Sequence, residues 1–339
     1  MKRLFCIVLA LVLLTGCTGP AQPELKQYNA TFLTLFDTVT TIVGRAENQE
    51  ELMAKAQAVH DDLLQYHQLF DIYNDYEGLN NLKTVNDNAG IAPVKVDRII
   101  IDLLLDCIDY YELTDGKVNV VMGSVLNLWH EARNDSLDDP RNAYLPEPDA
   151  LREGANHCDI NCLVIDEANS TVFLTDAEAR LDVGAVAKGW AAQRAAEKAP
   201  EGLLISVGGN VCATGPKAEN TPWVVGVQDP NGGENYLHTL YLNRGSMVTS
   251  GDYQRYFMVD GKIYHHIIDP VTLYPSQYFR SVTILCEDSG LADALSTAAF
   301  LLPLEEGMAL VKKAGAEAMW VDAEGKITCT EGFEAQIRT

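Results

Sequence analysis

The sequence has few cations for its size. It carries 25 Lys and Arg against 48 Asp and Glu, which gives a formal net charge of −23. Binding to a nucleic-acid backbone requires clustered Lys and Arg, so this composition argues against nucleic acid as a partner. The same excess of acids means that an anionic ligand would need a local cation or a metal ion to hold it.

Internal repeats, low-complexity tracts and a clear linker are also missing. Hydrophobic residues make up 47% of the chain, and about 320 residues follow the N-terminal leader described below, enough for one large globular domain with a sizeable core. We therefore expect a single folded domain over residues 29–339.

Paired metal-binding cysteines are missing as well. Six cysteines lie at irregular spacings in the expected folded domain, and both disulfides and buried thiols remain possible for them. His157 and Cys158 lie close to Cys162, but no second ligand pair follows at the spacing of a zinc site. A zinc centre is therefore not expected.

The N-terminus has the pattern of an export signal. Lys2 and Arg3 precede an apolar run of about ten residues, which is too short to span a bilayer. The run ends in Leu-Thr-Gly-Cys, which resembles a bacterial lipobox. We predict a signal peptide over 1–16, a lipidated Cys17, and a polar tether over 17–28. The alternative is an ordinary cleaved signal with an incidental cysteine. The lipid would hold the protein on the extracytoplasmic face of the cell membrane.

Hydrophobic periodicity predicts separate helices and hairpin-joined strands. Apolar residues recur at alternating four and three over 50–70, which predicts an amphipathic helix, and a second helix is expected from Asp97 to the Thr-Asp-Gly at 114–116. We expect one strand over residues 32–43, interrupted at Asp37. Residues 118–129 are ambiguous between strand and helix, and residues 134–149 are expected to form a surface excursion. Asp260-Gly261 predicts a hairpin. These patterns favour an α+β fold with mixed or antiparallel sheets flanked by helices.

The stretch from Leu181 to Ala195 is the first candidate for chemistry. Asp182, Ala185 and Lys188 are spaced by three, at the point where an expected apolar strand turns into an Ala-rich helix. The N-terminus of a helix offers unpaired N–H groups to an anion. The alternative is that the small residues only permit close packing.

Two further motifs carry candidate functional groups. Asp293 and Thr297 are four residues apart and would share one helix face, where their oxygens suit Mg²⁺; alternatively they are a surface Asp and a Thr bonded to its own helix. His265 and His266 are adjacent on an expected strand, so only one of them can face a given cleft. Residues 249–253, Thr-Ser-Gly-Asp-Tyr, either cradle a ligand or begin a strand.

Together these motifs resemble the ApbE family of FAD:protein FMN transferases. The matching runs are Asp182–Gly189, Gly208–Asn210, Thr249–Tyr253, His266–Pro270 and Ala292–Thr297, in family order. The resemblance implies a single α+β unit related to the T-fold, with FAD in a central cleft. It also implies Mg²⁺-dependent transfer of FMN from FAD to a Thr or Ser hydroxyl of an acceptor flavoprotein, with release of AMP.

The resemblance also implies roles for individual residues. Mg²⁺ would be bound by the backbone carbonyl of Ala185 and the side chains of Asp293 and Thr297, and His266 would be the catalytic base. The residues implied to contact FAD are Phe36, Tyr73, Lys117, Val118, Asn119, Asp182, Lys188, His266 and Ile267.

Three departures from the family pattern are visible. Phe36-Asp37-Thr38 stands where Met-Gly-Thr is common, and Asn119 stands where an acidic residue is common. Val271 and Leu273 replace the Arg and Gly of the family's DPRTGYP loop, which leaves open the shape of the loop beside His266. Two other functions therefore stay open: an Mg²⁺-dependent FAD pyrophosphatase, and an FAD-binding lipoprotein without turnover.

Overall fold

The structure is a computed structural model that describes residues 25–233 and 236–338. The predicted signal peptide and Cys17 lie outside these residues, as does most of the predicted tether. Within the described ranges, no helix is both long enough and apolar enough to cross a membrane.

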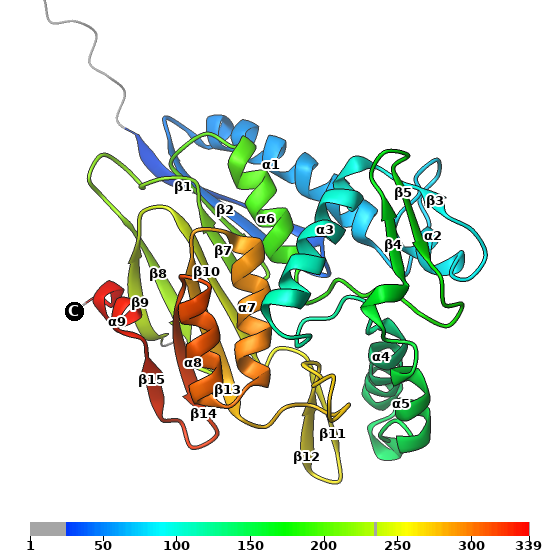
Figure 1. Cartoon of the computed structure of the whole chain (residues 1–339). Coiled ribbons are helices and arrows are strands. Elements are labelled where there is room, and N and C mark those ends of the chain that lie inside the picture. The colour runs from blue at the N-terminus through cyan, green and yellow to red at the C-terminus, as the bar shows by residue number, and fades with distance from the viewer. Residues whose placement is uncertain (1–24, 234–235, 339) are drawn as a thin grey trace, which may run out of the picture.

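The described chain alternates between helices and short strands (Figure 1). The strands are β1 (Lys26–Leu35), β2 (Thr38–Ala46), β3 (Val94–Lys95), β4 (Leu163–Asp166), β5 (Thr171–Leu174), β6 (Leu203–Val207), β7 (Asn210–Ala213), β8 (Trp223–Gln228), β9 (Tyr236–Leu242), β10 (Gly245–Gly251), β11 (Tyr256–Val259), β12 (Lys262–His265), β13 (Phe279–Cys286), β14 (Glu317–Asp322) and β15 (Ile327–Cys329). The α-helices are α1 (Gln49–Phe70), α2 (Leu82–Asp87), α3 (Arg98–Leu113), α4 (Gly123–Asp138), α5 (Pro148–Ala155), α6 (Ala187–Lys198), α7 (Ser289–Leu301), α8 (Leu304–Lys313) and α9 (Glu331–Gln336).

One eight-stranded sheet organises the fold, in the order β1-β2-β6-β7-β10-β13-β14-β15. Every neighbouring pair in it is antiparallel, which confirms the α+β prediction and resolves the sheet type. Adjacent residues along a strand point to opposite faces. Val248 and Trp320 therefore pack beneath the helices, whereas Met247 and Met319 pack against the β8–β9 hairpin and α9.

Helix α7 is the central, buried helix of the layer that covers the sheet. Eleven of its thirteen residues are buried, from Ser289 to Leu301, and it packs on β10 and β13 between α6 and α8 (Figure 1). A helix that is buried nearly all round must be built of small and apolar residues, as Ala292-Asp-Ala-Leu-Ser-Thr-Ala-Ala is. A carboxylate in such a helix requires a specific partner.

The remaining elements pack beside the sheet. They comprise α2, α3 and the small β3-β5-β4 sheet, and then α4, α5 and the separate β11–β12 hairpin. Trp129 of α4 contacts Phe257 of β11 within a third apolar cluster. The hairpin predicted at Asp260-Gly261 is present, with Val259 paired to Lys262.

Two predictions of local structure were wrong in detail, and the segment left ambiguous is now resolved. Residues 32–43 form not one strand but an antiparallel pair, β1 and β2, joined by Phe36 and Asp37 at φ 52° each. Two positive φ angles give a tight turn that fits the twist of the flanking strands. The ambiguous 118–129 segment is irregular as far as Met122 and helical from Gly123, and the helix continues into the supposed surface excursion as far as Asp138.

Candidate active site

All twelve residues predicted to bind FAD or metal, or to act as the base, line a single cavity of about 700 Å³. They come from positions as far apart as Phe36 and Thr297, and they line its wall together. The cavity is bounded by the turns at one end of the central sheet, by α4, by α7 and by the base of the β11–β12 hairpin. Their individual roles stay predictions.

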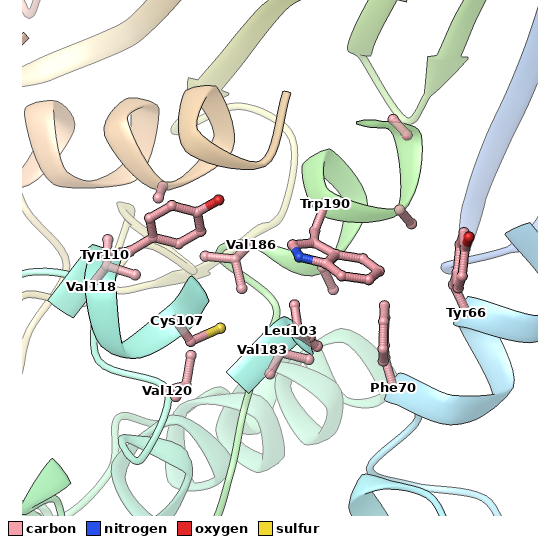
Figure 2. Close-up of a cluster of buried hydrophobic side chains, with 14 of the residues drawn as sticks. Tyr66, Phe70, Leu103, Cys107, Tyr110, Val118, Val120, Val183, Val186 and Trp190 are labelled. Carbon is pink, nitrogen blue, oxygen red and sulfur yellow. The ribbon is translucent and has the colours of Figure 1, made fainter. Parts of the chain in front are cut away.

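The turn from Asp182 to Lys188 is anchored by its apolar residues. Val183 and Val186 are buried, and Figure 2 shows both pointing into a cluster that includes Trp190 of α6 and side chains of α1 and α3. Asp182, Ala185 and Lys188, on the alternate positions, line the cavity instead. The strand predicted before Asp182 does not form, because Leu181 pairs with the side chain of Asn86 rather than with a strand.

The carbonyl of Ala185 is left free by the way α6 begins. In a longer helix the N–H of Gly189 would donate to this carbonyl, four residues earlier. Here the Gly189 N–H donates to Oδ2 of Asp293 at 2.8 Å, and α6 starts only at Ala187. Within the described residues the Ala185 carbonyl therefore has no hydrogen-bond donor, and it remains available to a ligand.

Asp293 and Thr297 are not the surface pair of the alternative interpretation. Asp293 is 4% exposed, and Lys188 Nζ lies 3.9 Å from its Oδ2. Burial raises the pKa of the Asp293 carboxyl, while Lys188, the Gly189 N–H and the neighbouring Asn210 amide oppose this. No hydrogen bond from the Thr297 hydroxyl to its own helix is present in the described part of the chain. Both oxygens line the cavity.

Gly189 permits the close contact between α6 and α7 that brings Asp293 to the turn. A Cβ at Gly189 would lie 2.2 Å from the carbonyl oxygen of Ser289 and 2.5 Å from Cβ of Asp293. We therefore expect Gly189→Ala to lower the free energy of unfolding by about 1–3 kcal/mol or more, because backbone must move, and to weaken FAD binding.

Thermal denaturation and FAD titration test this expectation. Gly307→Ala is the matched control, since a Cβ in α8 would meet its nearest atom at 3.4 Å and should be neutral or stabilising. Equal stability of the two variants would contradict the packing role of Gly189.

The two adjacent histidines have different environments. His265 is buried, with Nε2 2.6 Å from the carbonyl oxygen of Ser276 and Nδ1 accepting from the Ile267 N–H. His266 lines the cavity, and its Nδ1 lies 3.2 Å from the carbonyl oxygen of Arg255. An Nδ1–H that donates to this carbonyl leaves Nε2 as the free base. His266 is therefore the histidine that faces the cavity.

Desolvation and neighbouring positive charges favour the neutral form of His266. The imidazole is accessible to solvent through the open cavity, but protein walls surround it at longer range. Desolvation by these walls, followed by the positive charges of Arg255 and Lys188, lowers the pKa of His266 below its ordinary value. A neutral imidazole at neutral pH can accept a proton.

The loop beside His266 keeps a tight turn although it lacks the family's Gly. Leu273 adopts φ 64°, its N–H donates to the carbonyl of Asp269, and the Asp269 N–H donates to the carbonyl of Tyr274. The indole of Trp129 donates to the Leu273 carbonyl at 2.9 Å. The departure at Leu273 therefore strains the backbone without opening the loop, and Val271 is 77% exposed.

Leu273→Gly should consequently leave the activity nearly unchanged. Glycine relieves a left-handed strain of about 1 kcal/mol but gives up apolar contact and adds freedom to the unfolded chain. We expect the change in unfolding free energy to stay within about 1 kcal/mol. A large rise in the ratio of protein transfer to FAD hydrolysis, measured by product chromatography, would show that Leu273 reshapes the site.

The other residues predicted to contact FAD differ in which of their groups are available to a ligand. Tyr73 is 51% exposed and stacks on His130, with ring centroids 5.1 Å apart. Lys117 is already paired with Asp269 at 3.1 Å. The Asn119 side chain donates to the carbonyl of Cys158 and accepts from the N–H of Val121, so a ligand would meet mainly backbone in this segment.

Several cavity residues were not predicted to contact ligand. His130 lies just beyond the ambiguous 118–129 segment. Arg255 follows the Thr249–Tyr253 motif by two residues, and that spacing was the only signal for it. Thr249 and Ser250 end strand β10 instead of forming a separate cradle or beginning a strand, but both line the cavity, as Gly208 and Asn210 do.

The oxygen donors restrict the kind of metal that could bind. Among the described residues there is no group of three His, Cys, Asp or Glu that could hold a metal ion, and the six described cysteines are unpaired. One carboxylate, one hydroxyl and one carbonyl are hard oxygen donors, which suit Mg²⁺ with water or phosphate completing its coordination. The residues present therefore fit Mg²⁺ and do not fit zinc.

An antiparallel α+β fold that gathers hard oxygen donors, a lysine and a histidine around a cavity of about 700 Å³ is equipped to bind an anionic ligand such as a phosphate together with a divalent cation. Comparison with known families identifies the class of protein more closely. The model of the ApbE family matches residues 36–320, and the chain belongs to this family.

Individual relatives agree with this assignment. The FAD:protein FMN transferase of Treponema pallidum (strain Nichols) is 32% identical, covering 99% of this chain and 95% of that protein. The FAD:protein FMN transferase of Escherichia coli (strain K12) is 27% identical, covering 94% and 92%. The crystal structure of the ApbE protein from Thermotoga maritima superposes with a TM-score of 0.82 at 31% identity, covering 93% of this chain and all of that one.

Proposed function

We propose that this chain is an FAD:protein FMN transferase that uses Mg²⁺. The phosphorus of the FMN half of FAD would form a bond to a Thr or Ser hydroxyl oxygen of an acceptor flavoprotein. The bond from that phosphorus to the bridging oxygen would break, and AMP would leave. The observation that carries the proposal is the meeting of Ala185, Asp293, Thr297 and His266 in one cavity.

The chain's own residues have separate tasks in this reaction. Nε2 of His266 would take the proton of the attacking hydroxyl, while the Arg255 carbonyl holds the ring through Nδ1. Ala185, Asp293 and Thr297 would hold Mg²⁺, which when bound neutralises phosphate charge and polarises the phosphoryl group. Lys188, next to Asp293, adds a fixed positive charge to the same wall.

Two alternatives use the same cavity. Water in place of the acceptor hydroxyl would make the chain an FAD pyrophosphatase, and an inactive site would make it an FAD-binding lipoprotein. The free Nε2 of His266 and the free carbonyl of Ala185 support turnover over mere binding.

Chromatography of products with and without a candidate acceptor separates the three functions. Purified protein, FAD and Mg²⁺ with an acceptor bearing a Thr or Ser site should yield AMP and protein-bound FMN in equal amounts. AMP with free FMN alone would indicate a pyrophosphatase. Intact FAD after long incubation would refute both enzymatic functions.

We also propose a lipid anchor at Cys17 on the extracytoplasmic face of the cell membrane. The support is the lipobox pattern Leu14-Thr-Gly-Cys17 alone. Fatty-acid labelling of the expressed protein that disappears in Cys17→Ala would support the anchor, and labelling that persists would exclude Cys17.

A further inference from the structure

Two arginines have no acidic partner among the described residues: Arg255 in the cavity lining, and Arg133, which lies one turn of α4 beyond His130 of that lining. Arg133 of α4 and Arg255, just before β11, form no ion pair with any described residue, although the chain has 48 acidic residues. The Nε of Arg133 is buried without a hydrogen-bond partner among the described residues, and its guanidinium reaches only the Asn134 amide oxygen, at 3.3 Å. A buried cationic donor without a partner is costly unless a ligand completes it.

The two arginines also come from elements that pack on each other. Helix α4 packs on β11, with Trp129 against Phe257. Burial first, and then the charge of Arg255, lowers the pKa of Arg133. Two like charges on neighbouring elements, with no acidic partner among the described residues, indicate a site whose counter-ion comes from outside the chain.

The position of the pair connects it to the ligand cavity. Arg255 lines the cavity, and its carbonyl contacts His266. The stacked rings of Tyr73 and His130 line the same cavity, and His130 lies one turn of α4 before Arg133. The other cavity cations are already engaged, Lys117 with Asp269 and Lys188 with Asp293.

We propose that Arg133 and Arg255 form a clamp that binds phosphate oxygens of the FAD pyrophosphate. The proposal rests on the proposed function for the identity of the ligand. The neighbouring Tyr73–His130 stack offers a platform for one ring system of FAD, which would bring the attached phosphate to the arginines. The planar guanidinium fork matches phosphate oxygens, and neither arginine would have to leave an existing ion pair.

Binding measurements test the clamp without depending on turnover. We expect Arg255→Ala and Arg133→Met each to weaken FAD binding roughly 10- to 100-fold, the loss of a charge-assisted hydrogen bond, in a flavin-fluorescence titration. Arg255→Lys should recover part of the affinity. Binding of riboflavin, which has no phosphate, should be unchanged. Arg244→Ala is the control, since Arg244 pairs with Glu201 outside the cavity lining.

Two results would overturn the clamp. Equal weakening of FAD and riboflavin would assign the arginines to the packing of α4 and β11. Unchanged FAD affinity with a raised KM for the acceptor protein would assign them to acceptor recognition. Failure of the proposed function would give a different result. The wild-type protein would then show no turnover, while substitution of Arg255 would still weaken FAD binding.

Discussion

Asp293→Ala is expected to abolish Mg²⁺-dependent turnover. The substitution removes the only carboxylate among the three predicted ligands. Loss of a residue that only orients a metal ligand costs up to about 100-fold in activity, so loss of a ligand itself should cost more than that. The measurement is the initial rate of AMP release from FAD at saturating Mg²⁺. Activity equal to that of the wild type would refute the ligand role of Asp293.

Loss of folding must be separated from loss of metal. Asp293 also accepts the Gly189 N–H and lies beside Lys188, so Asp293→Ala leaves a buried donor unpaired and should lower the melting temperature. Asp293→Asn keeps an acceptor for Gly189 while removing the charge, and we expect it to fold but remain inactive. Asp102→Ala, which removes an exposed partner of Arg98, is the control and should retain activity.

His266→Ala is expected to slow FMN transfer by roughly 10²- to 10⁴-fold, the usual range for loss of a general base. FAD affinity should fall much less than the transfer rate, because His266 is only one of several implied FAD contacts that line the cavity. Single-turnover transfer and FAD titration on the same preparation separate the two effects. An equal loss in His265→Ala with His266 dispensable would show that the wrong histidine has been assigned.

The pH profile gives a second test of His266. Its lowered pKa keeps the base form populated at neutral pH, and the base form is lost only as the pH falls through that lowered value. The wild-type rate should therefore not show a midpoint near the ordinary histidine value of about 6.5. A loss of rate centred there and absent from His266→Ala would contradict the environment described for this ring.

Local patterns predicted the elements whose packing is local. The spacing of Leu52, Ala56, Val59 and Leu63 predicted α1 because these side chains form one buried stripe. The interval of three from Asp182 to Lys188 matches the residues that line the cavity, since Val183 and Val186 are buried in the core.

Other features depend on distant contacts and could not be predicted from local sequence. The N–H of Gly189 bonds to Asp293, 104 residues away, and only that bond frees the Ala185 carbonyl. Phe36 at a positive φ is held by a two-residue turn that lacks the usual Asn or Gly. The proposed ligand role of Arg255 could not be predicted from the local sequence, because Arg255 and Arg133 each look like a solvated surface charge when considered alone.

The central claim is that one cavity moves FMN from FAD onto another protein. The most direct test is the intact mass of a candidate acceptor after incubation with this protein, FAD and Mg²⁺. We predict a mass increase of one FMN less one water on a single Thr or Ser, absent with Asp293→Asn and strongly reduced with His266→Ala. An acceptor of unchanged mass, in a reaction that consumes FAD and releases free FMN, would contradict the claim.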